Sequence, residues 1–195
     1  MRLDILEHGH RLPARVFQKM VRVIFRQEID DVSKTAMYRP QFFGRPLFAL
    51  GSEVLRGPSY WTAAEREYMA VFSSRLNECA FCVQVHSETT RIESGGQLEP
   101  DSAPSIRPQL AAVLGLLGKV SLTPEQVTPD DVAAVRSAGV PDDAIVDALH
   151  VNLVFNTLNR LGNAFDWTWD SHDHVRTAAR AIHLFRYKLP SFVMR

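Results

Sequence analysis

A strong helix-start signal at Thr62 constrains the fold of this chain more than any other single feature. Thr62 can act as an N-cap, and Glu65 three residues later completes a capping box in front of an apolar stripe at helical spacing that ends at Leu76. The pattern predicts a helix over residues 63–76.

A second helix is expected directly after the first. Asn77 is the predicted N-cap, and the Gly95-Gly96 pair is a typical helix end. The helix then covers about residues 78–94 and places the backbone of Cys79 in its first turn.

The remaining sequence also shows helical rather than strand periodicity. Residues 30–60 are punctuated by proline and glycine and are expected to be irregular, apart from a short helix at 47–56. Further helices are expected at residues 14–29, 108–118, 129–139, 141–165 and 172–188. Because no run of alternating apolar residues is present, the predicted fold class is all-α. The first of these helices is basic and amphipathic, and we expect it to pack against the protein's own core.

Length and composition restrict the class of protein. The 195 residues fit one domain, and 46% hydrophobic with 23% charged residues is typical of a soluble globular protein. The 22 basic residues balance the 22 acidic ones, which argues against nucleic acid as a partner. No apolar run reaches the roughly 18–20 residues that span a bilayer, and the N-terminus lacks a signal-peptide pattern. The expected location is therefore the cytoplasm, with no membrane partner.

The chemistry of the chain is concentrated at Cys79, Cys82 and His86. These include the only two cysteines, and steps of three and four residues place all three side chains on one helical face. A reduced CxxC pair in a cytoplasmic protein is more often catalytic or metal-binding than structural. A thiolate can be oxidised to a sulfenic acid by a peroxide, and a second thiol nearby can condense with it to give a disulfide. The spacing predicts redox chemistry.

The residues alone leave open which cysteine reacts first. Partial positive charge at the helix N-terminus lowers a thiol pKa, which favours Cys79. His86 lies one turn after Cys82 and can take its proton, which favours Cys82.

The motif resembles that of the AhpD-like alkylhydroperoxidases in the carboxymuconolactone decarboxylase superfamily. Their signature is a glutamate, eleven residues, CxxC, three residues and a histidine, and here it is matched by Glu67 and the segment from Cys79 to His86. The similarity extends from about residue 55 to 166. We therefore interpret residues 1–50 as an N-terminal helical extension or arm, and residues 51–195 as an AhpD-like helical domain.

The resemblance implies a fold, an activity and partners. The family is all-helical, forms homotrimers or hexamers, and uses no metal or organic cofactor. Cys82 matches the peroxidatic cysteine that reduces a hydroperoxide, and Cys79 matches the resolving cysteine. Glu67 and His86 match its proton relay. An external dithiol, such as a thioredoxin-like or lipoyl reductant, would reduce the disulfide.

Two residues near the motif qualify this expectation. Glu67 lies one turn before Ala70 and Val71, so desolvation is expected to make its carboxylate a better proton acceptor. Some family members carry a histidine immediately before the second cysteine. That position is Phe81 here, which implies a shorter relay.

Three alternatives account for the same residues. A lactone decarboxylase-type enzyme would use His86 and Glu67 as acid and base, with the cysteines incidental. A zinc-stabilised helical oligomer would need a fourth ligand beside the motif, such as His172 or His174, although both are expected at the surface. The cysteines could instead be inert, either as small buried hydrophobes or as a disulfide. The nearby Trp167 and Trp169 are expected to be core or interface anchors, with an aromatic wall as the alternative.

Overall fold

The computed structural model describes residues 1–101, 106–188, 190 and 192, and in this part of the chain it contains helices but no strand. The all-α prediction is therefore confirmed. The helices are α1 (Ile5–His8), α2 (Leu12–Phe25), α3 (Asp31–Tyr38), α4 (Arg45–Arg56), α5 (Ala63–Leu76), α6 (Ala80–Glu93), α7 (Pro108–Leu122), α8 (Pro129–Ser137), α9 (Asp142–Phe165) and α10 (His172–Phe185). A π-helical turn, η1 (Pro40–Gly44), precedes α4, and a 3₁₀ turn, η2 (Pro124–Gln126), follows α7. None of the described helices is both long and apolar enough to cross a membrane.

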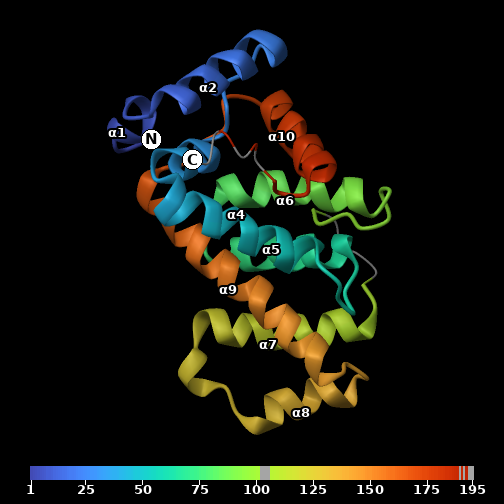
Figure 1. Ribbon diagram of the computed structural model, residues 1–195. Helices are drawn as coiled ribbons and strands as arrows, with labels where there is room; N and C mark the ends of the chain where they lie inside the picture. Colours follow the sequence, from blue (N-terminus) through green and yellow to red (C-terminus); the bar gives the residue numbers. More distant parts are fainter. Residues whose placement is uncertain (102–105, 189, 191, 193–195) are drawn as a thin grey trace.

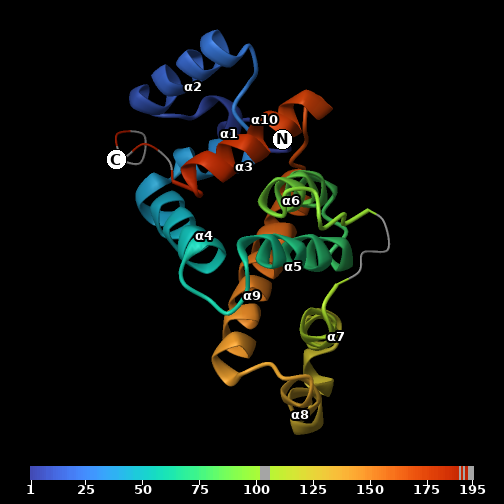
Figure 2. The same ribbon diagram turned by 90° about the vertical axis from the view of Figure 1, so that its right-hand side faces the viewer.

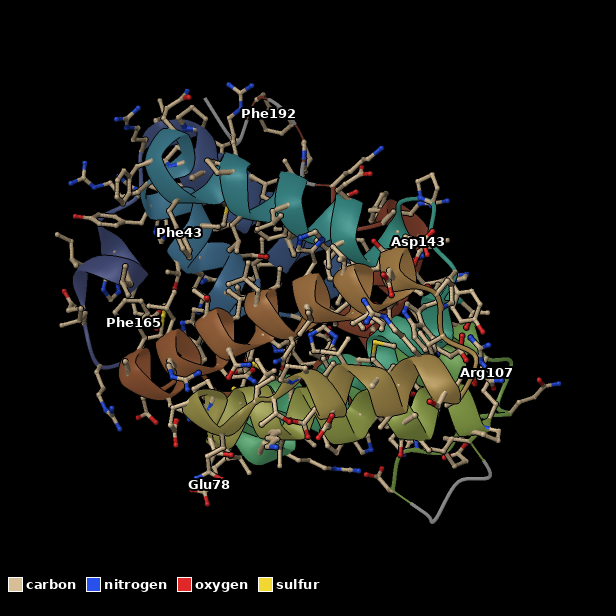
Figure 3. The ribbon with its side chains drawn as sticks, turned by 90° about the horizontal axis from the view of Figure 1, so that it is seen from below. Phe43, Glu78, Arg107, Asp143, Phe165 and Phe192 are labelled. Atoms are coloured by element: carbon tan, nitrogen blue, oxygen red, sulfur yellow. The ribbon has the colours of Figure 1, made fainter. Side chains whose placement is uncertain are left out.

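The long helix α9 runs through the molecule and organises the others around it. Figure 3 shows Asp143 and Phe165 near its two ends. Helices α5 and α6 lie side by side against it, with α7 and α8 at one end of the molecule and α2 at the other (Figures 1 and 2). The largest apolar core joins α4, α5, α7, α8 and α9.

Helix α5 begins where its capping signal predicts. The hydroxyl of Thr62 accepts a hydrogen bond from the Glu65 backbone N–H at 3.2 Å, and the Glu65 carboxylate accepts one from the Thr62 N–H at 2.9 Å. Arg107, just before α7, forms an ion pair with the same carboxylate. The cap therefore fixes the start of the helix that carries Glu67.

Buried hydrogen bonds hold α5 against α9. Ser73 donates to the side-chain oxygen of Asn152 at 2.8 Å, and Ser74 donates to that of Asn159 at 3.1 Å. All four side chains are essentially inaccessible to solvent. Because a buried polar group without a partner is costly, these pairs favour one register of α5 along α9.

The start of α6 differs from the prediction. Cys79, rather than Asn77, is the N-cap, so its backbone precedes the first helical turn. Asn77 instead ends α5, and its side-chain amide donates to the Ser73 carbonyl. Glu78 turns the chain between the helices with a left-handed φ of 53°, a conformation that the helical pattern alone does not reveal.

Residues 30–60 are more helical than the sequence indicated. Asp30 caps α3 by accepting a hydrogen bond from the Ser33 N–H at 2.8 Å. Pro40 and Pro46 lie in the first turns of η1 and α4, where a missing N–H leaves no hydrogen bond unmade. These prolines start helices instead of interrupting them.

Helix α2 does not bury its apolar stripe, and the expectation that it packs against the core is wrong for most of its length. Only Ala14 is buried, while Phe17 packs partly against a small neighbouring cluster. Figure 2 shows α2 apart from the main helical layers. Its exposed apolar residues are Leu12, Val16, Met20, Val23, Ile24 and Phe25.

Gly162 allows a close approach between α9 and the start of α6. A Cβ at this position would lie 2.9 Å from the ring of Trp167 and 3.2 Å from the sulfur of Cys79. Both contacts are tighter than normal packing permits, so the absence of a side chain lets α9, Trp167 and Cys79 meet.

Replacing Thr62 with alanine should destabilise the protein by about 1 kcal/mol, because the N3 amide of α5 loses its capping partner. Urea unfolding followed by circular dichroism measures the change. Thr157→Ala, at an exposed position inside α9, is the matched control and should cost nothing measurable. Equal stability of Thr62→Ala and wild type would contradict the role of the cap.

Replacing Gly162 with alanine should destabilise the protein by about 1–3 kcal/mol through overpacking. The same experiment should also show a changed alkylation rate at Cys79, the thiol that the new methyl group contacts. Gly115→Ala in α7 is the control, because no atom lies within 4 Å of a Cβ there. It should stabilise the helix by up to about 1 kcal/mol.

Candidate functional site

The candidate site lies between α5 and α6. The short connection between these helices brings them back along each other, so Glu67 near the start of α5 faces His86 in the middle of α6. Their side chains meet at 2.7 Å between Glu67 Oε2 and His86 Nδ1. The predicted pairing of these two residues is therefore present in the structure.

The two thiols are buried at the start of α6. Cys79 and Cys82 are 1% and 4% exposed, and their Sγ atoms lie 2.8 Å apart. Both cysteines are free, and a disulfide between them would require only a small further approach.

The local environment gives the two thiols different acidities. The hydrogen bond that they share lowers the pKa of Cys79 against the opposing effect of burial, and the backbone N–H groups of Phe81 and Cys82 lower it further. The same hydrogen bond, together with burial, raises the pKa of Cys82 well above its usual range. The favoured charge distribution is a Cys79 thiolate that accepts a hydrogen bond from the Cys82 thiol, as expected for a thiolate at a helix N-terminus.

Glu67 is completely buried, but three donors converge on its carboxylate. Oε1 lies 2.6 Å from Nη2 of Arg56 and accepts a 2.6 Å hydrogen bond from the hydroxyl of Tyr187, while Oε2 faces His86. Burial alone would raise the pKa of Glu67, but the hydrogen bond and charge of His86, the charge of Arg56 and the Tyr187 hydroxyl together lower it. The expectation that desolvation makes Glu67 a better proton acceptor is therefore wrong.

An ionised Glu67 determines the role of each ring nitrogen in His86. A carboxylate can only accept hydrogen bonds, so Nδ1 carries the hydrogen and Nε2 keeps its lone pair. The His86 ring also packs edge-to-face on Phe155, with centroids 4.6 Å apart. Nε2 is thereby the available base of the pair.

Cys82 and His86 open onto a cavity of about 170 Å³ that is lined mainly by apolar side chains. Cys79 and Glu67 do not line it. The wall consists of residues from α3, α4, α6, α9, α10 and the segments that follow α9 and α10: Asp30, Val32, Ser33, Leu47, Phe48, Gly51, Leu55, Phe81, Val85, Val154, Phe155, Leu158, Trp167, Trp169, Ala178, Ala181, Ile182, Phe185, Tyr187 and Lys188. Each thiol therefore has a distinct place, with Cys82 at the cavity and Cys79 behind it.

Phe81 and the two tryptophans form an aromatic wall beside the thiols. The rings of Phe81 and Trp169 are stacked, with centroids 4.2 Å apart, and the Trp169 indole donates to the Phe81 carbonyl at 2.9 Å. Trp167 packs against the same Phe81 ring at 5.6 Å. The position where some AhpD-like proteins carry a histidine is thus part of an apolar wall.

Other candidates from the sequence lie in different places. His172 is exposed, as expected, whereas His174 is buried against Trp169, so its predicted surface position is wrong. Within the described residues, no group of three or more His, Cys, Asp or Glu side chains is arranged to hold a metal ion. Glu78 is exposed and lies at the surface in Figure 3.

Sequence reasoning missed Arg56 and Tyr187. Arg56 is an isolated arginine at the end of α4, and Tyr187 follows α10, far from the motif in sequence. No local spacing connects either residue to Glu67. Only the packing of α4 and of the segment after α10 around α5 brings them together.

Comparison with known proteins gives a match in structure. No protein-family model matches the chain, and no curated protein sequence matches it. The fold is similar to an uncharacterized peroxidase-related protein from Silicibacter sp. TM1040, with a TM-score of 0.74 and 21% identity over 89% of this chain and 93% of that one. It is also similar to an uncharacterized peroxidase-related protein from Ralstonia eutropha JMP134, described as an alkylhydroperoxidase AhpD core, with a TM-score of 0.72 and 25% identity over 88% and 92% of the two chains.

The shared fold covers 89% and 88% of this chain in the two comparisons. The likeness in structure and the motif spacing therefore agree, although they come from independent observations. The fold of this chain is therefore similar to that of AhpD-like peroxidase-related proteins.

Proposed function

We propose that this protein is a thiol-dependent peroxidase that reduces organic hydroperoxides through Cys82 and Cys79. The observation that carries the proposal is the placement of the thiols: Cys82 lines the apolar cavity, and Cys79 lies 2.8 Å behind it. Cys82 can therefore contact a substrate in the cavity, while Cys79 is close enough to form a disulfide with it.

In the first step, Cys82 loses its proton to Nε2 of His86. The Cys82 thiolate attacks the terminal oxygen of the hydroperoxide, the O–O bond breaks, and the alkoxide leaves with the proton that His86 holds. Cys82 is oxidised to a sulfenic acid, and the hydroperoxide is reduced to an alcohol. The high pKa of Cys82 makes the base necessary, and Glu67 holds the His86 ring through the contact at Nδ1.

In the second step, the Cys79 thiolate attacks the sulfur of the Cys82 sulfenic acid. The S–O bond breaks, a disulfide forms, and the hydroxide leaves as water after taking a proton from solvent. The lowered pKa of Cys79 supports this role, because the resolving thiol is already a nucleophile. An external dithiol, thioredoxin-like or lipoyl, then returns both cysteines to the thiol form.

The lining of the cavity favours an organic substrate over hydrogen peroxide. A volume of about 170 Å³ accepts a compact apolar group beside Cys82. Burial of apolar surface contributes roughly 25 cal/mol per Å², a gain that hydrogen peroxide cannot make. The apolar organic group of the hydroperoxide would therefore supply the binding free energy, and its O–O bond would be the bond that Cys82 cleaves.

Hydroperoxide turnover should depend on both cysteines in different ways. With cumene hydroperoxide and a dithiol, Cys82→Ser should have no activity, because the attacking atom is gone. Cys79→Ser should instead stop after one equivalent and accumulate a sulfenic acid, which dimedone labelling and mass spectrometry detect. Turnover that persists unchanged in Cys82→Ser would sink the proposal, and labelling of Cys79 in that variant would reverse the two roles.

Filling the cavity should separate organic substrates from hydrogen peroxide. Ala181→Leu places three additional carbons in the wall and should raise KM for cumene hydroperoxide several-fold, with a smaller effect on the rate with hydrogen peroxide. Ala134→Leu, at an exposed position on α8, is the matched control and should change neither. Equal effects on both substrates would show that the cavity does not bind the organic group.

A further inference from the structure

A buried cluster of charged and polar groups lies behind His86 and is not part of the CxxCxxxH motif. Arg56 bridges two carboxylates, with Nη2 at 2.6 Å from Glu67 and 2.9 Å from Glu93. Tyr187 donates its hydroxyl to the same Glu67 oxygen that Arg56 contacts. At the outer edge of the cluster, His183 lies 3.1 Å from Glu93.

These contacts divide the Glu67 carboxylate into two parts. Oε1 faces Arg56 and Tyr187, so Oε2 is left for His86. A carboxylate held in this way cannot rotate without breaking a buried, charge-assisted hydrogen bond. The orientation of the His86 ring therefore depends on residues from α4 and from the segment after α10.

Tyr187 is aimed at Glu67 by an unusual backbone. Arg186 and Tyr187 both have left-handed φ angles, of 50° and 63°, although neither is glycine. Such conformations persist only where surrounding contacts hold them. Here the Arg186 side chain donates to the Arg56 carbonyl at 2.6 Å, and the Arg56 guanidinium lies over the Tyr187 ring at 5.1 Å.

We propose that Arg56 and Tyr187 are positioning residues of the thiol site, which keep Glu67 ionised and directed at His86 and so leave His86 Nε2 as the proton acceptor at the cavity. The chemical consequence of this inference rests on the proposed peroxidase function. Neither residue touches the reacting atoms of the thiols. Both act through Glu67.

Arg56 and Tyr187, which contact Glu67 Oε1, keep their charge states across neutral pH. Burial acts against the charge of Arg56, but the nearby Glu67, Tyr187 and Glu93 raise its pKa, so it stays a cation. Burial and the charge of Glu67 raise the pKa of Tyr187 well above its usual range, so its hydroxyl stays a donor. Arg66, the neighbour of Glu67 on α5, also carries charge and opposes Arg56. The remaining side chain in contact with the carboxylate is His86, through Nδ1.

Tyr187→Phe tests the inference with the smallest change, because it removes one hydroxyl and keeps the ring. Without that donor, Glu67 presents more negative charge to His86 and the thiols. The first proton to leave His86, Cys79 and Cys82, taken together, is then lost less readily. The acidic limb of the kcat/KM profile for cumene hydroperoxide should move to higher pH by about half a unit to one unit, which is a loss of roughly three- to ten-fold below the limb. The rate on the plateau above it should recover.

Two further variants complete the experiment. Tyr60→Phe is the matched control: it removes a hydroxyl that contacts Arg107 outside the site, and its profile should match that of the wild type. Arg56→Lys keeps the charge but loses the planar guanidinium, in which Nη2 contacts both carboxylates while Nη1 donates to the Leu55 carbonyl. The limb should therefore move in the same direction as in Tyr187→Phe.

A second readout separates the two proposals. The rate of Cys82 alkylation by iodoacetamide against pH, measured in a Cys79→Ser background with and without Tyr187→Phe, should show the same upward shift without any turnover. If wild type does not consume hydroperoxide but this shift occurs, the proposed function fails and the positioning role stands. The positioning role would be overturned if the pH profile of Cys82 alkylation were the same with and without Tyr187→Phe. It would also be overturned if Tyr187→Phe lowered the alkylation rate by the same factor at every pH.

Discussion

The ionised carboxylate of Glu67 is the interaction on which the rest of the site depends. It is completely buried, and a buried charge is tolerated only when other groups compensate for its lost hydration. Arg56 from α4, His86 from α6 and Tyr187 after α10 supply that compensation. The carboxylate therefore joins three separate parts of the chain. Because His86 is held by this carboxylate, its chemistry depends on how those parts pack.

The thiol pair relies on a different physical effect, the asymmetry of a helix end. Cys79 caps α6 and faces free backbone N–H groups, whereas Cys82 lies one turn inside and opens onto an apolar cavity. The shared hydrogen bond and the N-terminal amides stabilise negative charge on Cys79, whereas the same hydrogen bond and burial disfavour it on Cys82. The helix N-terminus and the proximity of His86 gave conflicting predictions from the sequence, and they apply to different thiols. Cys79 is the more acidic thiol, and Cys82 is the thiol that a substrate in the cavity can reach.

Prediction from sequence succeeded where local signals were sufficient. The capping box of α5 and the long apolar periodicity of α9 are properties of neighbouring residues, and both helices appear at the expected positions. It failed around Pro40 and Pro46, because a proline that breaks a helix and one that starts a helix look alike until the helix boundary is known. It failed again at α2, whose periodicity identifies an apolar face but not whether anything covers it.

The sequence by itself determined the all-α class and the shared helical face of Cys82 and His86, which follow from short-range spacing. The pairing of Glu67 with His86 was expected only from the resemblance to AhpD-like proteins. Only the tertiary structure decided the ionisation of Glu67, the different acidities of the two thiols and the contributions of Arg56 and Tyr187. Those properties depend on burial and on contacts between distant segments, and both effects are set by how the helices pack.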